Sequence, residues 1–221
     1  MSPASSADRI TVLLVDDHAV VREGYRRLLE KRGDIVVVGE ADNGADAYDR
    51  FCKLEPNVVI LDIALPGISG IEAMRRILAR DEKTRVLIFS MYEDGIYADR
   101  ALKAGASGYV TKASAPNVLV DAVHTVARGK QYLSPDVAQK LALRVTTSTA
   151  GSATSLSPRE FEILRLLVNG MPVKDIAESM GLNPKTVANH QSAIKQKLGA
   201  ESGLQLIRIG EDILSGARRR K

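Results

Sequence analysis

Residues 10–128 alternate short aliphatic runs with segments of helical periodicity, and this alternation constrains the fold more than any other feature. The aliphatic runs lie at 10–15, 35–38, 57–61, 85–89 and 108–111, and the helical segments at 19–31, 44–54, 69–80, 96–104 and 115–128. Each run is rich in β-branched residues and nearly continuous in hydrophobicity, which is typical of strands buried on both faces of a parallel sheet. The alternation predicts an α/β fold with right-handed crossovers, and five strands favour the doubly wound, flavodoxin-like order 2-1-3-4-5.

The composition excludes several other classes of protein. With 45% hydrophobic and 26% charged residues among 221, the chain is typical of a globular protein of one or two domains, not of a disordered or collagen-like one. No apolar run approaches the roughly 20 residues that cross a bilayer, and residues 1–9 lack the apolar core of a secretory signal. The single cysteine, Cys52, cannot form an intrachain disulfide, which fits a reducing cytosol. We therefore expect a cytoplasmic protein with no membrane partner.

Charged and hydroxyl residues follow four of the five runs. Asp16 and Asp17 end the first, Asp62 the third, Ser90 the fourth and Lys112 the fifth. The carboxyl ends of parallel strands share one edge of the sheet, where ligands bind in such folds. Three neighbouring carboxylates repel one another, so the cluster predicts a counter-ion, and an oxygen-rich acidic pocket favours Mg²⁺. With the lysine and the hydroxyl, this set is suited to a phosphoryl group, with Asp62 as the in-line nucleophile.

Each of these residues alone also has a structural interpretation. A lone aspartate at a strand end is usually a turn or capping residue, Ser90 alone would be a cap, and Lys112 alone a solvated loop charge. Their coincidence at one edge favours the functional interpretation. His18 follows the acid pair and is interpreted as a helix-start residue in preference to a metal or catalytic one. Cys52 is interpreted as a half-buried small apolar residue in preference to a redox sensor.

Residues 10–130 resemble the receiver domain of two-component response regulators. The resemblance rests on the paired acids, on Asp62 within Leu-Asp-Ile-Ala-Leu-Pro-Gly, on Ser90, and on Lys112 within Gly-Tyr-Val-Thr-Lys. It implies that Asp62 accepts phosphate from a phosphohistidine on a sensor histidine kinase, that Ser90 bonds a phosphoryl oxygen, and that Lys112 pairs with it. Ala113 departs from the many receivers that carry a proline on a cis bond there. We expect a trans bond, because a cis bond before alanine costs about 3 kcal/mol.

The same resemblance implies a set of Mg²⁺ ligands and a switch residue. Asp17, Asp62 and the backbone carbonyl of Ala64 would ligate the ion, and Asp16 would help through a water molecule. Tyr109 occupies the aromatic switch position of the family.

An uncharged run of small polar residues at 145–155 predicts a flexible linker, beyond which helical signals resume. Ser157 and Glu160 have the spacing of a capping box around Pro158, and Asn183 precedes a second proline in the same way. The predicted helices run at 158–168, 173–180, 184–198 and 203–214. Two of them are joined by a three-residue turn containing glycine, which predicts a helix-turn-helix within an all-α four-helix domain. Small structural helical domains share this spacing and remain the alternative on pattern alone.

The third of these helices has the chemistry of a DNA-binding surface. Residues 183–197 carry three lysines and no acid, whereas the net charge of +4 for the whole chain equals that of its basic tail, 218–221. Lysine neutralises phosphates, and asparagine, glutamine, serine and threonine bond base edges. We predict DNA contacts from Lys185, Thr186, Ala188, Asn189, Gln191, Ser192, Lys195 and Lys197.

Residues 156–214 resemble the LuxR-type helix-turn-helix of the NarL/FixJ subfamily of response regulators. The resemblance includes Leu-Ser-Pro-Arg-Glu at 156–160 and Lys-Leu-Gly at 197–199. It implies that Ala188, Asn189 and Ser192 point into the major groove and that the last helix forms the dimer contact on DNA. The family often has lysine where this chain has Ala188, so the target sequence stays open.

Together these features predict a DNA-binding transcriptional response regulator and not an enzyme beyond its own phosphoryl transfer. Phosphorylation of Asp62 is expected to favour one of two receiver conformations, to promote a homodimer and to control binding to double-stranded DNA. The expected boundaries are a receiver at 8–130, a helix and flexible linker at 131–155, the DNA-binding domain at 156–217 and the basic tail at 218–221.

Three alternatives to this prediction differ from it in the residues that they require. A phosphatase similar to haloacid dehalogenases needs a second acid two residues after its nucleophile, where this chain has Ala64. A flavodoxin needs a phosphate loop of Ser, Thr or Gly after the first strand, where Asp16 and Asp17 would repel phosphate. A receiver that dimerises without phosphorylation stays open, although the complete acid set argues against it.

Overall fold

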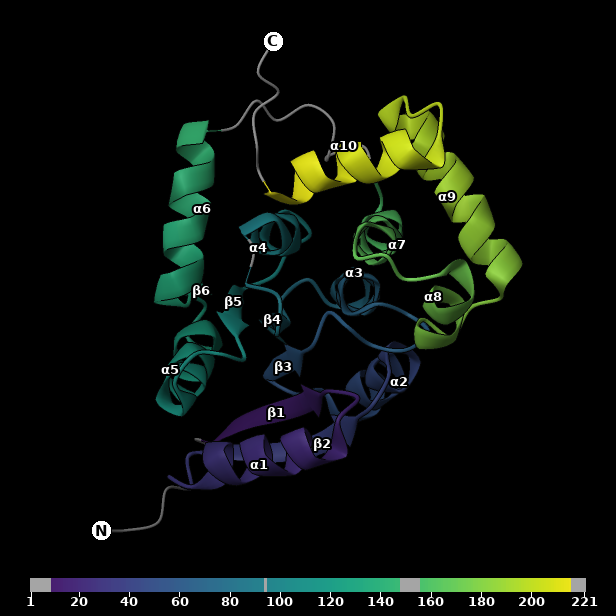
Figure 1. The fold of residues 1–221 in the computed structure, drawn as a ribbon. Helices are drawn as coiled ribbons and strands as arrows, with labels where there is room; N and C mark the ends of the chain where they lie inside the picture. The colour runs from purple at the N-terminus through teal and green to yellow at the C-terminus, as the bar shows by residue number, and fades with distance from the viewer. Residues whose placement is uncertain (1–8, 94, 148–155, 216–221) are drawn as a thin grey trace. The chain divides into compact units, whose positions relative to one another are not determined.

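The structure is a computed structural model that describes residues 9–93, 95–147 and 156–215. The chain divides into two compact units, Met1–Leu141 and Ala142–Lys221. Figure 1 shows the alternating strands and helices of the first unit and the helices of the second. The predicted linker at 145–155 lies mostly outside the described residues, and the basic tail at 218–221 lies outside them entirely.

The first unit contains a parallel sheet whose strand order is β2-β1-β3-β4-β5-β6. Its strands are β1 (Ile10–Val15), β2 (Ile35–Ala41), β3 (Val58–Leu61), β4 (Arg85–Ser90), β5 (Gly108–Thr111) and β6 (Tyr132–Leu133). The predicted order of the first five strands is confirmed. Strand β2 continues to Ala41, beyond the predicted end at residue 38, because its backbone stays paired with β1 across a register shift between Val12 and Leu13. Strand β6 was not predicted, because a strand of two residues has no recognisable pattern in the sequence.

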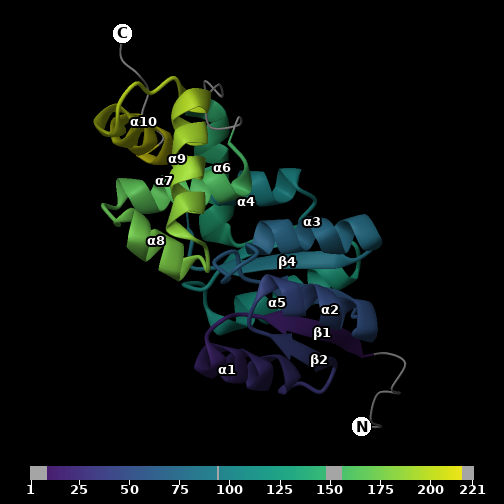
Figure 2. The same cartoon turned by 90° about the vertical axis from the view of Figure 1, so that its right-hand side faces the viewer.

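Five helices connect the first five strands and lead on from the last of them. They are α1 (Ala19–Glu30), α2 (Gly44–Leu54), α3 (Gly70–Arg80), α4 (Gly95–Lys103) and α5 (Pro116–Ala127). Helices α1 and α5 cover one face of the sheet, and α2, α3 and α4 cover the other (Figures 1 and 2). The side chains of Asn43 and Ser69 cap α2 and α3. Ser69 was predicted as the first residue of its helix, but it is the N-cap, and α3 begins at Gly70.

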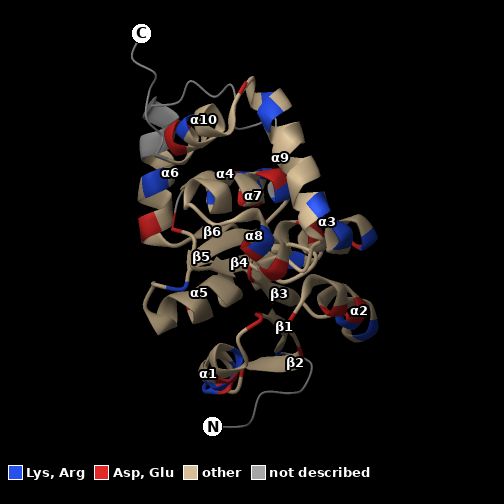
Figure 3. Ribbon diagram, turned by 45° about the vertical axis from the view of Figure 1, so that its right-hand side comes forward, with Lys and Arg blue, Asp and Glu red and all other residues tan. Residues whose placement is uncertain are grey.

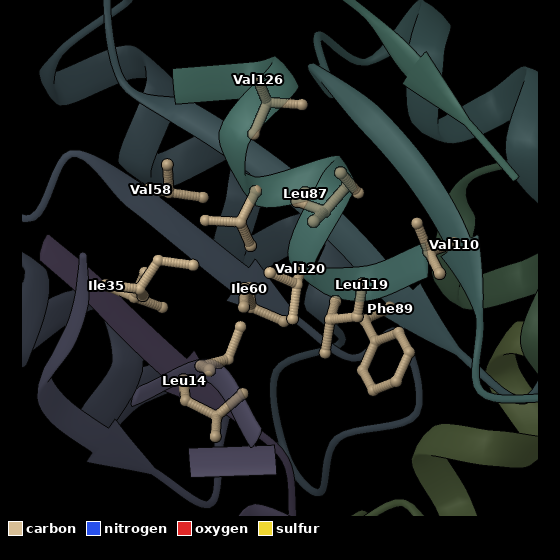
Figure 4. Packing of buried hydrophobic residues seen from close by; sticks show 14 of the residues in the cluster. Leu14, Ile35, Val58, Ile60, Leu87, Phe89, Val110, Leu119, Val120 and Val126 are labelled. Atoms are coloured by element: carbon tan, nitrogen blue, oxygen red, sulfur yellow. The ribbon is translucent and has the colours of Figure 1, made fainter. Parts of the chain in front are cut away.

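The core beneath α1 and α5 is aliphatic. Leu14, Ile60 and Leu87 from neighbouring strands form one buried cluster with Leu119 and Val120 of α5, and Phe89 lies at one end of it (Figure 4). These side chains are almost wholly excluded from solvent, and each contributes about 1.5–3 kcal/mol of burial free energy. The strands are therefore apolar on both faces over most of their length.

A further helix, α6 (Pro135–Thr147), follows β6 directly, within the stretch 131–155 where a helix was expected. The second unit then contains α7 (Pro158–Val168), α8 (Val173–Ser179), α9 (Pro184–Leu198) and α10 (Gly203–Ser215). Ser157 and Glu160 form the predicted capping box, and Asn183 caps α9. The buried apolar residues of this unit include Phe161, Ile163, Leu164, Leu167, Ile176, Ala177, Met180, Val187, Ile194 and Leu206.

Among the described residues, no helix combines the length and the hydropathy that crossing a membrane requires. The peptide bond between Lys112 and Ala113 is trans, since the described residues contain no cis bond.

Candidate functional site

The strand ladder itself brings the predicted site residues to one edge. The Asp62 N–H donates to the Val15 carbonyl at 3.0 Å, which places Asp62 beside Asp16. The Lys112 N–H donates to the Ser90 carbonyl at 2.8 Å, so these two residues are neighbours as well. The four strands β1, β3, β4 and β5 are neighbours in the sheet, and each of these residues lies at or just after the end of one of them. Because the strands are parallel, these ends lie at the same edge of the sheet.

Lys112 bridges two buried carboxylates at the centre of this edge. Its Nζ lies 2.5 Å from Asp62 Oδ2 and 2.5 Å from Asp16 Oδ2. All three side chains are at most 7% exposed. Burial alone would lower the pKa of Lys112, but attraction and hydrogen bonds from Asp62 and Asp16 outweigh it and raise that pKa. The lysine therefore carries its charge at neutral pH, as a group that pairs with a phosphoryl oxygen must.

The first acid pair forms a compact group with the residue that follows it. Ligand atoms of Asp16, Asp17 and His18 lie within 4.8 Å of one another, and Asp62 does not belong to that group. His18 Nδ1 is 2.7 Å from Asp17 Oδ1, yet the imidazole is 68% exposed. His18 is the N-cap residue of α1 and makes no side-chain cap bond, so its predicted position as a helix-start residue is confirmed.

The donor set fits a hard divalent cation. Asp16 and Asp62 are buried and share one ammonium, that of Lys112, whereas Asp17 is partly exposed and lies beside the His18 imidazole. Buried carboxylates in excess of their counter-charges are costly, which favours a bound cation. Carboxylate oxygens are the ligands that Mg²⁺ prefers. The Ala64 N–H donates to Asp62 Oδ1 at 3.2 Å, so Ala64, predicted as a carbonyl ligand, lies in the turn that holds Asp62.

Ser90 and Tyr109 lie next to the carboxylates and are both fully buried. The Ser90 Oγ makes no hydrogen bond of ordinary geometry among the described residues and has the Tyr109 hydroxyl as a polar neighbour, which leaves it able to bond a phosphoryl oxygen. The Tyr109 hydroxyl donates to the Tyr92 carbonyl at 2.7 Å, so the ring points inward. Burial raises the pKa of Tyr109 and keeps the phenol protonated.

The structure adds Gly70, the first residue of α3, which the sequence analysis did not single out. A Cβ at Gly70 would lie 1.8 Å from the Asp62 carbonyl oxygen and 2.9 Å from the Ile63 Cα. The absence of a side chain therefore lets α3 begin directly against the backbone of Asp62. Nothing in a single sequence distinguishes this glycine from one in an ordinary turn.

A polar contact also joins the end of β5 to α6. The Thr111 hydroxyl donates to Asp136 Oδ2 at 2.9 Å, and the Ser114 hydroxyl lies 3.4 Å from Asp136 Oδ1. Burial alone would raise the pKa of Asp136, but the hydrogen bonds from Ser134 and Thr111 outweigh it and lower that pKa. The first turn of α6 is thus attached to the residue beside Lys112. These residues are 25 positions apart and no motif connects them.

The predicted DNA-contacting residues all lie on α9, which carries lysines and no acid (Figure 3). Lys185, Ala188, Asn189, Ser192 and Lys197 are exposed, whereas Thr186, Gln191 and Lys195 are half-buried. Val187 and Ile194 are buried on the opposite side of the helix.

One of these lysines has a partner within its own unit. Lys197 Nζ donates to both carboxylate oxygens of Glu160, at 2.8 and 2.7 Å. Burial alone would raise the pKa of Glu160, but the bonds from Lys197 and Ser157 outweigh it and lower that pKa. The charge of Lys197 is therefore offset inside the protein, unlike that of Lys185 or Lys195, for which the described residues provide no ion pair.

Comparison with known proteins identifies the families to which the two units are similar. Residues 12–124 match the family model described as the response regulator receiver domain, and residues 154–209 match that of bacterial regulatory proteins of the luxR family. The response regulator UvrY of Escherichia coli strain K12 is 36% identical over 203 residues, which cover 90% of this chain and 93% of UvrY.

Two solved structures are also similar. A two-component response regulator of the LuxR family from Aurantimonas sp. SI85-9A1 is 45% identical, with a TM-score of 0.61, and covers 62% of this chain and 99% of its own. A structure of two RcsB dimers bound to two parallel DNAs is 27% identical, with a TM-score of 0.59, and covers 95% of this chain and 100% of its own.

The two family models together span both units and identify a receiver and DNA-binding protein, not a classical enzyme. The strand order and the all-helical C-terminal unit are those predicted from the sequence. The chain belongs to the two-component response regulators that carry a receiver domain and a LuxR-type DNA-binding domain, the NarL/FixJ subfamily.

Proposed function

We propose that Asp62 is the phosphoacceptor of this response regulator and that a phosphohistidine of a sensor histidine kinase is its donor. A carboxylate oxygen of Asp62 forms the new O–P bond while the P–N bond to the histidine breaks. The leaving imidazole nitrogen keeps the electron pair and takes up a proton from solvent. The observation that carries this proposal is Lys112, whose Nζ lies 2.5 Å from a carboxylate oxygen of Asp62 in a buried site.

Two further groups support a phosphoryl group at this position. The Ser90 hydroxyl is buried and makes no hydrogen bond of ordinary geometry among the described residues, so it is available to bond one phosphoryl oxygen. We propose that Asp17, Asp62 and the Ala64 carbonyl ligate Mg²⁺ directly, with Asp16 acting through water. Mg²⁺, when bound, offsets negative charge on the oxygens of the transferring phosphoryl group.

We propose that phosphorylation promotes a homodimer that binds double-stranded DNA through α9. The charge added at Asp62 acts on Ser90, Lys112 and the neighbouring Tyr109, which we propose as the switch residue. The RcsB structure contains dimers bound to DNA, which supports the same assembly here. A dimer presents two recognition helices to half-sites about one helical turn apart.

The proposed DNA contacts are those of exposed and half-buried residues on one side of α9. Asn189 and Ser192 face the base edges beside Ala188, whose methyl group suits a thymine methyl. Lys185 and Lys195 contact phosphates, together with Thr186 and Gln191. Lys197 is the weakest member of the predicted set, because Glu160 already accepts its hydrogen bonds.

We propose domain boundaries at 8–130 for the receiver, 131–155 for the connecting helix and linker, and 156–217 for the DNA-binding domain, with a basic tail at 218–221. A cytoplasmic location accords with a kinase partner and with DNA as the target.

The phosphoacceptor is tested by intact-mass measurement of the full chain incubated with Mg²⁺ and acetyl phosphate. We expect the mass of one phosphoryl group to be added to the wild type and to Asp49→Ala, an exposed carboxylate on α2, but not to Asp62→Ala. An adduct that persists in Asp62→Ala would refute the assignment. A kinase phosphorylated on histidine replaces acetyl phosphate if the small donor does not react.

A further inference from the structure

A second cation, Arg22 of α1, lies beside the acidic group, and the proposed phosphoryl transfer does not use it. Its Nη1 donates a close hydrogen bond to the backbone carbonyl of Asp16. Its Nε lies 3.3 Å from Glu40 Oε2 on the neighbouring strand β2. The side chain is 15% exposed, so the guanidinium is largely enclosed between these two partners.

The Asp16 carbonyl stands where the strand ladder of β1 has ended. The Asp16 N–H still donates to the Ala41 carbonyl at 3.1 Å, but the chain then turns away into α1. A buried carbonyl without a donor costs free energy comparable to a lost hydrogen bond, and Arg22 supplies the donor here. The Asp16 carbonyl oxygen and the Asp17 nitrogen belong to one planar peptide unit. Fixing that oxygen therefore also fixes the direction of the bond from this peptide unit to the Asp17 Cα.

The side chain of Asp16 is held independently of this bond. Its Oδ1 accepts the His18 N–H at 2.9 Å, and its Oδ2 pairs with Lys112. Without the hydrogen bond from Arg22, the peptide unit between Asp16 and Asp17 could rotate, although both carboxylates must point toward one ion. Arg22 prevents this rotation by holding the Asp16 carbonyl.

Glu40 in turn holds Arg22 in place. The same carboxylate accepts Arg26 Nη1 at 2.8 Å, and Arg26 also lies 3.5 Å from Glu30. The two arginines are one helical turn apart on α1 and both pair with Glu40, but the hydrogen bond to the Asp16 carbonyl comes from Arg22. Arg26 is therefore a matched control, since it has the same residue type, charge and ion-pair partner.

We infer that Arg22 is a positioning residue for the metal-binding acids of this receiver, acting through the Asp16 carbonyl and anchored by Glu40. This inference rests on the proposed Mg²⁺ site and adds a residue to its support. A charge argument predicts the opposite effect, because removing a nearby cation should strengthen the binding of a divalent metal ion. The sign of the change in metal affinity therefore separates the two explanations.

The test measures metal binding on the full chain without phosphoryl transfer. Binding of Mn²⁺ is followed by electron paramagnetic resonance of the free ion, and Mg²⁺ by competition, for the wild type, Arg22→Met, Arg22→Lys and Arg26→Met. We expect Arg22→Met to raise both dissociation constants about tenfold, as loss of a group that orients a ligand does. Arg26→Met is expected to stay within about twofold, because a half-exposed ion pair contributes little.

Phosphorylation kinetics give a second readout. For Arg22→Met, we expect the Mg²⁺ concentration for half-maximal phosphoryl uptake to rise by the same factor while the rate at saturating Mg²⁺ is retained. Arg22→Lys keeps the charge and the ion pair with Glu40 but cannot fork to both partners, so it should also weaken metal binding. This variant decides the test if Arg22→Met does not fold.

The outcomes are distinguishable. If the folded Arg22 variants bind Mn²⁺ as tightly as the wild type or more tightly, the inference is overturned while the proposed function stands. If the wild type itself binds no Mn²⁺ and accepts no phosphoryl group, the proposed function fails instead.

Discussion

The hydroxyl of Thr111 donates a 2.9 Å hydrogen bond to the carboxylate of Asp136, which joins the end of β5 to the first turn of α6. Thr111 precedes Lys112, the cation that bridges Asp16 and Asp62. Further along α6, Lys140 pairs with Glu93 in the loop that follows β4, at 2.8 Å. The helix that leaves the receiver is therefore attached to the end of β5, beside Lys112, and to the loop that follows Ser90.

The contact between Thr111 and Asp136 should stabilise the start of α6. In Asp136→Asn we expect faster amide hydrogen exchange at residues 137–141, equivalent to a loss of about 1 kcal/mol, because an amide is a weaker acceptor than a carboxylate. Asp49→Asn on the exposed side of α2 is the control and should leave these amides unchanged. Equal exchange in the wild type and Asp136→Asn would show that the contact does not hold the helix.

Gly70→Ala should damage both the fold and the site. The added Cβ would meet the Asp62 carbonyl at 1.8 Å, so either α3 or the backbone of Asp62 must move. We expect the receiver to lose at least about 2 kcal/mol of unfolding free energy, together with much of its phosphoryl uptake. Urea unfolding followed by tyrosine fluorescence measures this selectively, because all six tyrosines lie within residues 25–132.

Gly24→Ala provides the matched control for that experiment. A Cβ at Gly24, inside α1, meets nothing within 4 Å, and its backbone is helical. This variant should raise stability by about 0.5–1 kcal/mol through helix propensity alone. If Gly70→Ala behaved like Gly24→Ala, the close approach of α3 to Asp62 would be refuted.

The pair of Glu160 and Lys197 predicts a pH dependence for the second unit. Because the folded unit lowers the pKa of Glu160, the ionised carboxylate stabilises the fold above its ordinary value of 4.5. That contribution is lost as pH falls through 4.5 and then through the lowered pKa. Glu160→Gln should weaken α7 at neutral pH, and its difference from the wild type should shrink in acid.

Amide exchange of α7, corrected for intrinsic rates at each pH, measures this difference. Glu178→Gln, an exposed acid on α8, is the control and should follow the wild type at every pH. A difference between Glu160→Gln and the wild type that stays constant from neutral to acid pH would contradict the charge pairing.

Two lysines of α9 should differ in their contribution to DNA binding. For duplex DNA, the logarithm of the affinity falls as the logarithm of the salt concentration rises, and each phosphate contact increases the magnitude of this slope by about 0.9. Lys195→Ala should therefore reduce the slope by about one, whereas Lys197→Ala should leave it unchanged, because Glu160 already pairs with Lys197. Fluorescence anisotropy with a mixed-sequence duplex over a range of salt concentrations measures both slopes. Equal slopes for the two variants would contradict this assignment.

Several features were predictable because they depend on local pattern. Aliphatic runs of the right length form buried strands, and the right-handed crossover restricts how they are ordered, so the order 2-1-3-4-5 followed from the sequence. The same pattern placed Asp16, Asp62 and Lys112 at one edge. The capping residues Ser157 and Asn183 were equally visible, because a cap acts within three residues.

Strand β6 and the exact end of β2 were not predictable. A two-residue strand has no period, and its pairing with β5 depends on the chain already being folded around it. Strand β2 continues past its aliphatic run because β1 offers backbone partners there, not because of its side chains.

The sequence by itself determined the fold of each unit, the cluster of acids and the position of α9, the proposed recognition helix, since strand and helix periods and chain-adjacent caps are local properties. Tertiary structure decided which distant side chains meet. Arg22 reaches the Asp16 carbonyl because Glu40 on β2 holds its guanidinium, Asp136 reaches Thr111 across 25 residues, and Lys197 reaches Glu160 across 37. Such contacts depend on strand register and on the rotation of each helix about its axis, which no local pattern contains.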